Sequence, residues 1–177
     1  MLLIAVNLTA AGTAFYLYTS GKDYSVSQKE RAHFIGLSYM TMNNEFYKII
    51  SEEINARIEA EGDRMVMRDP ALDVERQITQ IEEMLDMGID VLVVTPVDSE
   101  KIGDVLKKAR EKGVSIVVLD TGVSDQEVAD CTITSDNYGA GAAVGEYFLQ
   151  QHETARVVIM THQVAQSGRD RVQGFLD

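Results

Sequence analysis

Short apolar runs alternate with longer segments of helical periodicity from His33 onward. Such alternation predicts βα units that build a parallel sheet with helices on both faces. The expected strands span residues 33–39, 64–68, 90–95, 114–119 and 131–134, and the expected helices span residues 45–61, 73–87, 99–112 and 139–151. The pattern therefore predicts an α/β fold with a doubly wound parallel sheet of the Rossmann-like or flavodoxin-like kind.

The same pattern starts again in the last part of the chain. Residues 156–160 form an apolar run that predicts another strand, and a further helix is expected to start near Gly168. The first lobe is therefore expected to comprise residues 32–136. Residues 137–177 are expected to form the beginning of a second, incomplete α/β lobe, truncated at Asp177.

The first 31 residues differ from the rest in composition. Residues 1–18 are mostly apolar and uncharged, with a length between that of a signal-peptide core and that of a membrane span. No basic residue precedes the run and no clean cleavage site ends it, which favours an uncleaved membrane anchor over a signal peptide. A buried amphipathic helix is the alternative. Residues 19–31 are polar and predict a linker.

The composition argues against several classes of function. The net charge is −12, with 28 acidic against 16 basic side chains, so the electrostatic field repels phosphate backbones and nucleic acid is not an expected partner. The three histidines lack the spacing of a metal site. The single cysteine, Cys131, is expected to be a buried structural thiol. No metal and no cofactor are therefore predicted.

The sequence lacks the motifs of common enzymes. A nucleophile elbow, a phosphate-binding P-loop and a GxGxxG turn after the first strand are all absent, so no catalytic residue is predicted. Gly139, Gly141 and Gly145 lie close together, but in a helix-forming stretch. Small residues in a helix favour close packing rather than pyrophosphate binding.

Polar and aromatic side chains follow two of the predicted strands. Asn44, Phe46 and Tyr47 come after the first strand, and Asp120 comes at the end of the fourth. Ligands of open parallel sheets bind at the carboxyl ends of the strands, so these residues are expected at one binding edge. A carboxylate accepts hydrogen bonds from hydroxyls, a carboxamide donates and accepts, and aromatic rings cover apolar sugar faces. The set therefore suits a sugar or polyol.

Each of these residues also has a purely structural interpretation. Asn44 is a good cap for the helix that follows it. Phe46 and Tyr47 are adjacent helix positions that point in different directions, so either can belong to the core and at most one needs to face a ligand. Asp120 can form the turn that follows its strand.

Four segments occur in an order typical of one family. They are FIGLSYMTMNNEFY, DVLVVTPVDSEKIGDVLKKAREKGVSIVVLD, TSDNYGAGAAVGEYF and GRDRVQGF. From His33 to Asp177 the chain resembles the ribose/galactose class of type I periplasmic binding proteins, the sugar-binding proteins of ABC transporters. The resemblance implies two α/β lobes, joined by hinge strands, that close on a sugar without changing it chemically.

The resemblance also implies roles for individual residues. The carboxamide of Asn44 and the carboxylate of Asp120 would hydrogen-bond sugar hydroxyls. Phe46 and Tyr47 would flank the sugar ring, and Arg171 of the second lobe would donate hydrogen bonds to the sugar.

Three further positions complete this comparison. Asn137 would lie at the hinge, and Thr121 stands in the binding set where ribose binders often place an arginine. Glu45 replaces a proline that is common in the family. Losing a guanidinium changes which hydroxyls can be satisfied, so these departures favour a pentose, hexose or polyol other than ribose.

The implied function is that of an extracytoplasmic substrate-binding protein that delivers a sugar or polyol to an ABC permease. A ligand-sensing domain with a membrane sensor as its partner is the alternative. The effector core of a lactose-repressor-type regulator is less favoured, because such a regulator carries a basic helix-turn-helix headpiece. A first lobe by itself offers half of a binding cleft and is expected to bind sugar weakly.

Overall fold

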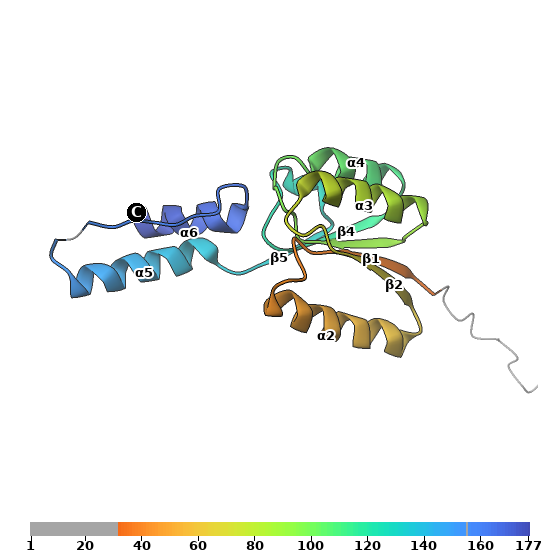
Figure 1. The fold of residues 1–177 in the computed structure, drawn as a ribbon, viewed down its shortest axis with the longest axis horizontal. Coiled ribbons are helices and arrows are strands. Elements are labelled where there is room, and N and C mark those ends of the chain that lie inside the picture. The colour runs from red at the N-terminus through yellow and green to blue at the C-terminus, as the bar shows by residue number, and fades with distance from the viewer. Residues whose placement is uncertain (1–31, 155) are drawn as a thin grey trace, which may run out of the picture. The chain divides into compact units, whose positions relative to one another are not determined.

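A five-stranded parallel sheet forms the centre of the fold in the computed structural model, which describes residues 32–154 and 156–177 (Figure 1). Its strands are β1 (Phe34–Ser38), β2 (Arg64–Arg68), β3 (Val91–Val94), β4 (Ser115–Asp120) and β5 (Cys131–Thr134), in the order β2-β1-β3-β4-β5. The helices are α2 (Glu45–Glu61), α3 (Val74–Asp86), α4 (Gly103–Glu111), the short 3-10 helix η1 (Gln126–Val128), α5 (Asn137–Gln151) and α6 (Gln166–Leu176). The predicted doubly wound α/β lobe is confirmed.

Helices cover both faces of this sheet (Figure 1). On one face, Ile81 of α3 and Leu106 of α4 share a core with Leu92 of β3. On the other face, Tyr47 of α2 packs in a second core with Val93. Leu92 and Val93 are neighbours in β3 and enter opposite cores, because successive side chains of a strand point to opposite faces.

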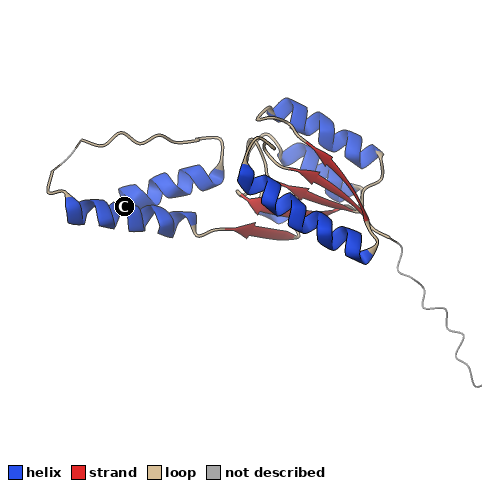
Figure 2. Ribbon diagram, turned by 60° about the horizontal axis from the view of Figure 1, so that its bottom comes forward, coloured by secondary structure: helices blue, strands red, loops and turns tan. Residues whose placement is uncertain are grey.

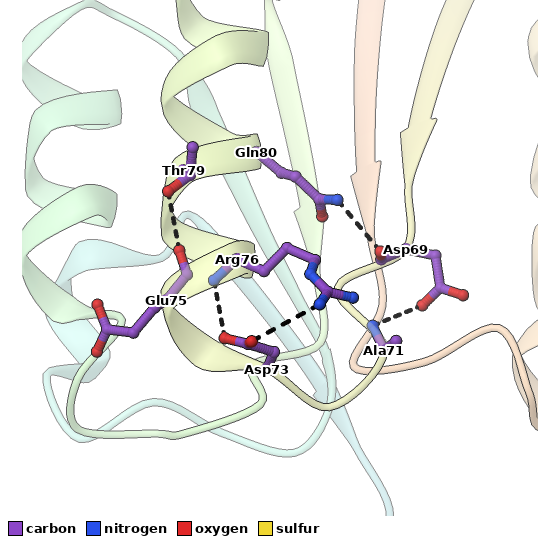
Figure 3. A network of polar contacts seen from close by, with 7 residues as sticks. All are labelled: Asp69, Ala71, Asp73, Glu75, Arg76, Thr79 and Gln80. Carbon is purple, nitrogen blue, oxygen red and sulfur yellow. Dashed lines mark hydrogen bonds and ion pairs between the residues drawn. The ribbon is translucent and has the colours of Figure 1, made fainter.

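The connection from β2 to α3 shows how local polar contacts set the start of a helix (Figure 3). Asp73 Oδ1 accepts a hydrogen bond from the amide of Arg76 at 3.0 Å, as an N-cap does. Asp69 Oδ1 accepts from the amide of Ala71 at 2.8 Å, and Gln80 Nε2 donates to the Asp69 carbonyl oxygen at 3.2 Å. The helix predicted over residues 73–87 is therefore confirmed as α3.

Helix α4 begins later than its periodicity predicts. The helix was expected from Ser99, but residues 99–102 form turns and α4 starts at Gly103. Asp98 Oδ1 accepts hydrogen bonds from the amides of Glu100 and Lys101, at 2.9 and 3.1 Å. This side-chain acceptor stabilises a local turn that competes with the first helical turn.

Residues 156–160 form no strand, so the strand predicted there is wrong (Figure 2). The segment is a loop between α5 and α6, in which Val158 is 90% and Met160 is 95% exposed. A strand requires a neighbour that pairs with its backbone groups, and in the described part of the chain no strand lies beside this segment. The helix predicted near Gly168 is present as α6.

The expected burial of Cys131 is also wrong. Cys131 is exposed, as is every other residue of β5. Strand β5 pairs with β4 alone and forms an edge of the sheet. Apolar–polar alternation indicates a strand, but it does not tell whether another element covers the apolar side.

Helices α5 and α6 pack closely through glycines, as the sequence predicted for this stretch. A Cβ atom on Gly141 of α5 would collide with the carbonyl oxygen of Arg171 in α6, and one on Gly174 would collide with that of Tyr138. A Cβ atom on Gly145 would lie 2.8 Å from the Phe175 carbonyl oxygen. The two backbones therefore approach so closely that a methyl group has no room between them.

We predict that Gly141→Ala loosens this helix pair and lowers the free energy of unfolding by about 1 to 3 kcal/mol, as overpacking does. Gly103→Ala is the matched control, because a Cβ atom on Gly103 would meet no heavy atom within 4 Å. Thermal unfolding followed by circular dichroism compares the two variants. Equal midpoints for both would contradict the proposed steric contact.

Candidate functional site

The carboxyl edge of the sheet brings a phenol and a carboxylate into contact. Tyr47, in the first turn of α2, donates a hydrogen bond from its hydroxyl to Asp120 Oδ2 at 2.8 Å. Asp120 is the last residue of β4, so the start of α2, which follows β1, meets the end of β4 here although β3 lies between the two strands. The structure thus brings together the two residue clusters selected from the sequence, whereas their role in ligand binding stays a prediction.

Asp120 combines an unusual backbone conformation with a partly free carboxylate. Its φ angle is 69°, in the left-handed region, where aspartate and asparagine are among the better tolerated residues. In the part of the chain that the structure describes, Oδ2 accepts from Tyr47 and no donor reaches Oδ1. One carboxylate oxygen is therefore available for a ligand hydroxyl.

The aromatic residues at this edge differ in exposure. Tyr47 is 3% exposed and stacks on Tyr39, with ring centroids 5.6 Å apart. Phe46 meets Tyr47 edge to face at 5.2 Å and is 49% exposed. Tyr47 therefore belongs to the core through its ring, and Phe46 is the aromatic side chain with a free surface.

Asn44 caps α2, which is the structural role considered for it. Its Oδ1 accepts a hydrogen bond from the amide of Phe46 at 3.0 Å, and the residue is exposed. Among the described residues its Nδ2 group donates to none. The cap occupies the oxygen of the carboxamide and leaves its nitrogen for a ligand.

The other predicted residues, all of which the structure describes, make no hydrogen bond to the Asp120 carboxylate. Thr121 is fully buried, and its hydroxyl oxygen accepts from the Ser167 amide at 3.0 Å. Asn137 is buried at the start of α5 and donates from Nδ2 to the Ser135 carbonyl oxygen at 3.0 Å. Arg171 is exposed and lines a pocket of about 700 Å³ between α5, α6 and residues 157–162. This pocket contains neither Tyr47 nor Asp120.

A buried glutamine supports the same edge and was missed in the sequence. Gln77 of α3 is fully buried, and its Nε2 donates to Ser38 Oγ at 3.1 Å and to the Thr95 carbonyl oxygen at 3.0 Å. Its Oε1 accepts from the Val97 amide at 2.8 Å. The signal in the sequence was its position on the apolar face of α3, one turn before Ile81.

Burial shifts the acid–base behaviour of both stacked tyrosines. Burial, then the hydrogen bond to Asp120 and the charge of that carboxylate, raise the pKa of Tyr47 above the usual value of about 10. Burial raises the pKa of Tyr39 to about 12. Both phenols therefore lose their protons more readily in the unfolded chain. Their contribution to stability is complete below about pH 10 and is lost as the pH rises toward the folded-state pKa values.

We predict that Tyr47→Phe reduces the loss of stability above about pH 10, because the phenylalanine cannot ionise. Urea midpoints measured from about pH 8 to about pH 11 are expected to fall less steeply for this variant than for the wild type. Tyr147→Phe, at an exposed tyrosine of α5, serves as the control. Parallel decreases for wild type and Tyr47→Phe would contradict the prediction.

No group of three or more His, Cys, Asp or Glu side chains in the described residues is arranged to hold a metal ion. None of the helices in those residues combines the length and the apolar character needed to cross a membrane.

Comparisons with known proteins agree with this architecture. The chain is 26% identical over 153 residues to the ribose import binding protein of Bacillus subtilis, covering 85% of this chain and 50% of that protein. It is 27% identical over 187 residues to the D-ribose/D-allose-binding protein of Pseudomonas aeruginosa, covering 99% of this chain and 57% of that protein. The chain thus spans about half the length of the curated relatives it matches.

A solved structure shows the same fold. The myo-inositol binding protein of Caulobacter, bound to myo-inositol, aligns with a TM-score of 0.74 and 21% identity, over 82% of this chain and 50% of that protein. The sequence profile of the family described as "Periplasmic binding protein domain" matches residues 35–177, which is most of the chain. The chain therefore belongs to the periplasmic binding protein domain family.

Proposed function

We propose that the chain captures a neutral sugar or related polyol at the carboxyl edge of its sheet. The observation that carries this proposal is the Tyr47–Asp120 hydrogen bond. It holds the Asp120 carboxylate at the carboxyl end of β4 and leaves one of its two oxygens without a partner among the described residues. A carboxylate that accepts from two adjacent hydroxyls is a common way to select a polyhydroxylated ligand. The exposed ring of Phe46 offers an apolar face for the C–H side of the same ligand.

The charges around this edge favour a neutral ligand over an anionic one. Asp120 contributes a negative charge, and two cations of α2 and β2, the elements that follow β1, are paired with carboxylates. Lys48 pairs with Glu45 at 3.6 Å, and Arg68 pairs with Glu83 at 3.9 Å. A sugar phosphate would therefore be repelled without a compensating cation in this part of the described chain.

The wider role follows from the family rather than from the edge itself. The relatives described above carry names for sugar binding and import. We therefore propose an extracytoplasmic protein that binds its ligand without chemical change and presents it to an ABC permease. Import is favoured over sensing because the curated relatives are named for import and binding. Nothing in the proposed edge requires a catalytic group.

Ligand titration monitored by nuclear magnetic resonance tests the proposal. The ¹⁵N-labelled chain is titrated with pentoses, hexoses, furanoses and cyclitols up to millimolar concentrations, so that weak binding is also detected. Amide shifts centred on Tyr47 and Asp120 are expected for at least one neutral compound. The matched sugar phosphate is expected to leave these amides unchanged. Shifts that cluster elsewhere, or that require the phosphate, would contradict the proposal.

A further inference from the structure

The first turn of α6 lacks a cap from its own N-terminal residue. Ala165 occupies the N-cap position and makes no side-chain hydrogen bond to the helix. The first amides of a helix have no partner within the helix and need an acceptor from elsewhere. Thr121, in the loop after β4, supplies one, because its Oγ1 accepts from the amide of Ser167 at 3.0 Å. The hydroxyl is removed from solvent, since Thr121 is fully buried.

A second loop of the first lobe holds the segment just before α6. Ser99, which is 1% exposed, donates from both its amide and its hydroxyl to the Val164 carbonyl oxygen, each at 3.1 Å. Arg169 of α6 donates from Nη2 to Ser99 Oγ at 2.9 Å and from Nη1 to the Gln163 carbonyl oxygen at 2.7 Å. The loops after β3 and β4 therefore hold the start of α6 through two separate sets of hydrogen bonds.

We propose that Thr121 and Ser99 are positioning residues that fasten α6 to the first lobe. Thr121 follows Asp120 directly in the chain, and Ser167 precedes Arg171 by one helical turn. Fixing the Ser167 amide to Thr121 thus fixes the helix that carries Arg171 relative to the Asp120 carboxylate. The effect on α6 stands on the observed contacts alone, and the effect on a sugar rests on the function proposed above.

Thr121→Val tests the capping contact, because valine preserves the volume and removes the acceptor. Amide hydrogen exchange at Ser167 in the full chain is expected to become up to about tenfold faster, the scale of one lost hydrogen bond. Exchange at the core amide of Leu92 is expected to stay unchanged. Thr121→Ser, which retains a hydroxyl, is expected to restore slow exchange. Ser124→Ala removes an exposed hydroxyl of the same loop and is the neutral control.

Sugar titration of the same variants separates this proposal from the function on which it partly rests. If exchange at the Ser167 amide is unchanged in Thr121→Val, the capping role is refuted, regardless of the sugar affinity. If the sugar affinity falls while that exchange is unchanged, Thr121 is only a ligand contact. Faster exchange supports the role even where the wild type binds no tested sugar. If Thr121→Val fails to fold, Ser99→Ala tests whether the first lobe fastens α6, because it removes the hydroxyl that bonds Val164 and Arg169. Faster exchange at the Ser167 amide is expected, and unchanged exchange there refutes the fastening.

Discussion

Replacing Asp120 with asparagine is expected to weaken binding of the best neutral sugar by about 10- to 100-fold. Hydrogen bonds to a charged group contribute about 1.5 to 3 kcal/mol, and every 1.4 kcal/mol corresponds to about a tenfold change in affinity. Asparagine is the appropriate replacement because it tolerates the left-handed φ of 69° and keeps the size of the side chain. Alanine would add backbone strain to the loss of the ligand contact.

Titration of wild type and Asp120→Asn under the same conditions measures this effect. Asp125→Asn is the matched control, because it removes the same charge from the loop that follows and disrupts a surface ion pair with Lys107 at 3.3 Å. Such surface pairs contribute little, so this control is expected to bind as the wild type does. Equal affinities for wild type and Asp120→Asn would exclude Asp120 from the binding site.

Replacing Gln77 with methionine is expected to lower the free energy of unfolding by about 2 to 4 kcal/mol, a large effect for one residue. The variant leaves the Val97 amide and the Thr95 carbonyl oxygen without their glutamine partner in a buried setting. Each buried polar group that loses its partner costs about 1 to 3 kcal/mol. The shape of the side chain is largely retained, so the loss reports on the hydrogen bonds.

Urea unfolding measures this loss in the free energy of unfolding from the shift of the midpoint, provided that the dependence of that free energy on urea concentration is unchanged. The same replacement at Gln126, an exposed residue of η1, is the control and is expected to change stability by less than about 0.5 kcal/mol. A Gln77→Met variant as stable as this control would show that the three hydrogen bonds contribute nothing net.

The sequence predicted the elements whose signals are local. Helix α2 and strands β2 and β5 have the predicted bounds. For α2 the signals are local, because its apolar positions recur at helical spacing, a capping asparagine directly precedes it and a glycine directly follows it. Predictions failed where a neighbour decides the outcome. A strand at residues 156–160 depends on a pairing partner, and the burial of Cys131 depends on a covering element. The sequence of each segment determines neither of them.

The candidate site divides in the same way. Residue type and position at strand ends were enough to select Asp120 and Tyr47. The hydrogen bond between them joins residues 73 positions apart and follows from the order of the strands. The hydrogen bond between Thr121 and Ser167 joins residues 46 positions apart, and no local sequence motif predicts it. The left-handed backbone conformation of Asp120 could not be predicted from the sequence either, because the neighbouring residues do not specify it.

The strand order also has a consequence for how the chain reaches its fold during synthesis. Strand β1 is the first to emerge, β2 pairs with one of its edges and β3 with the other, and β4 and β5 then extend the growing side in turn. Each new strand therefore meets a template that is already assembled, and none waits for a partner made later. Once β2 has paired, the sheet grows at one edge alone, while β2 remains the outer strand on the other side. Growth at one edge limits the misassembly to which slowly forming parallel sheets are prone.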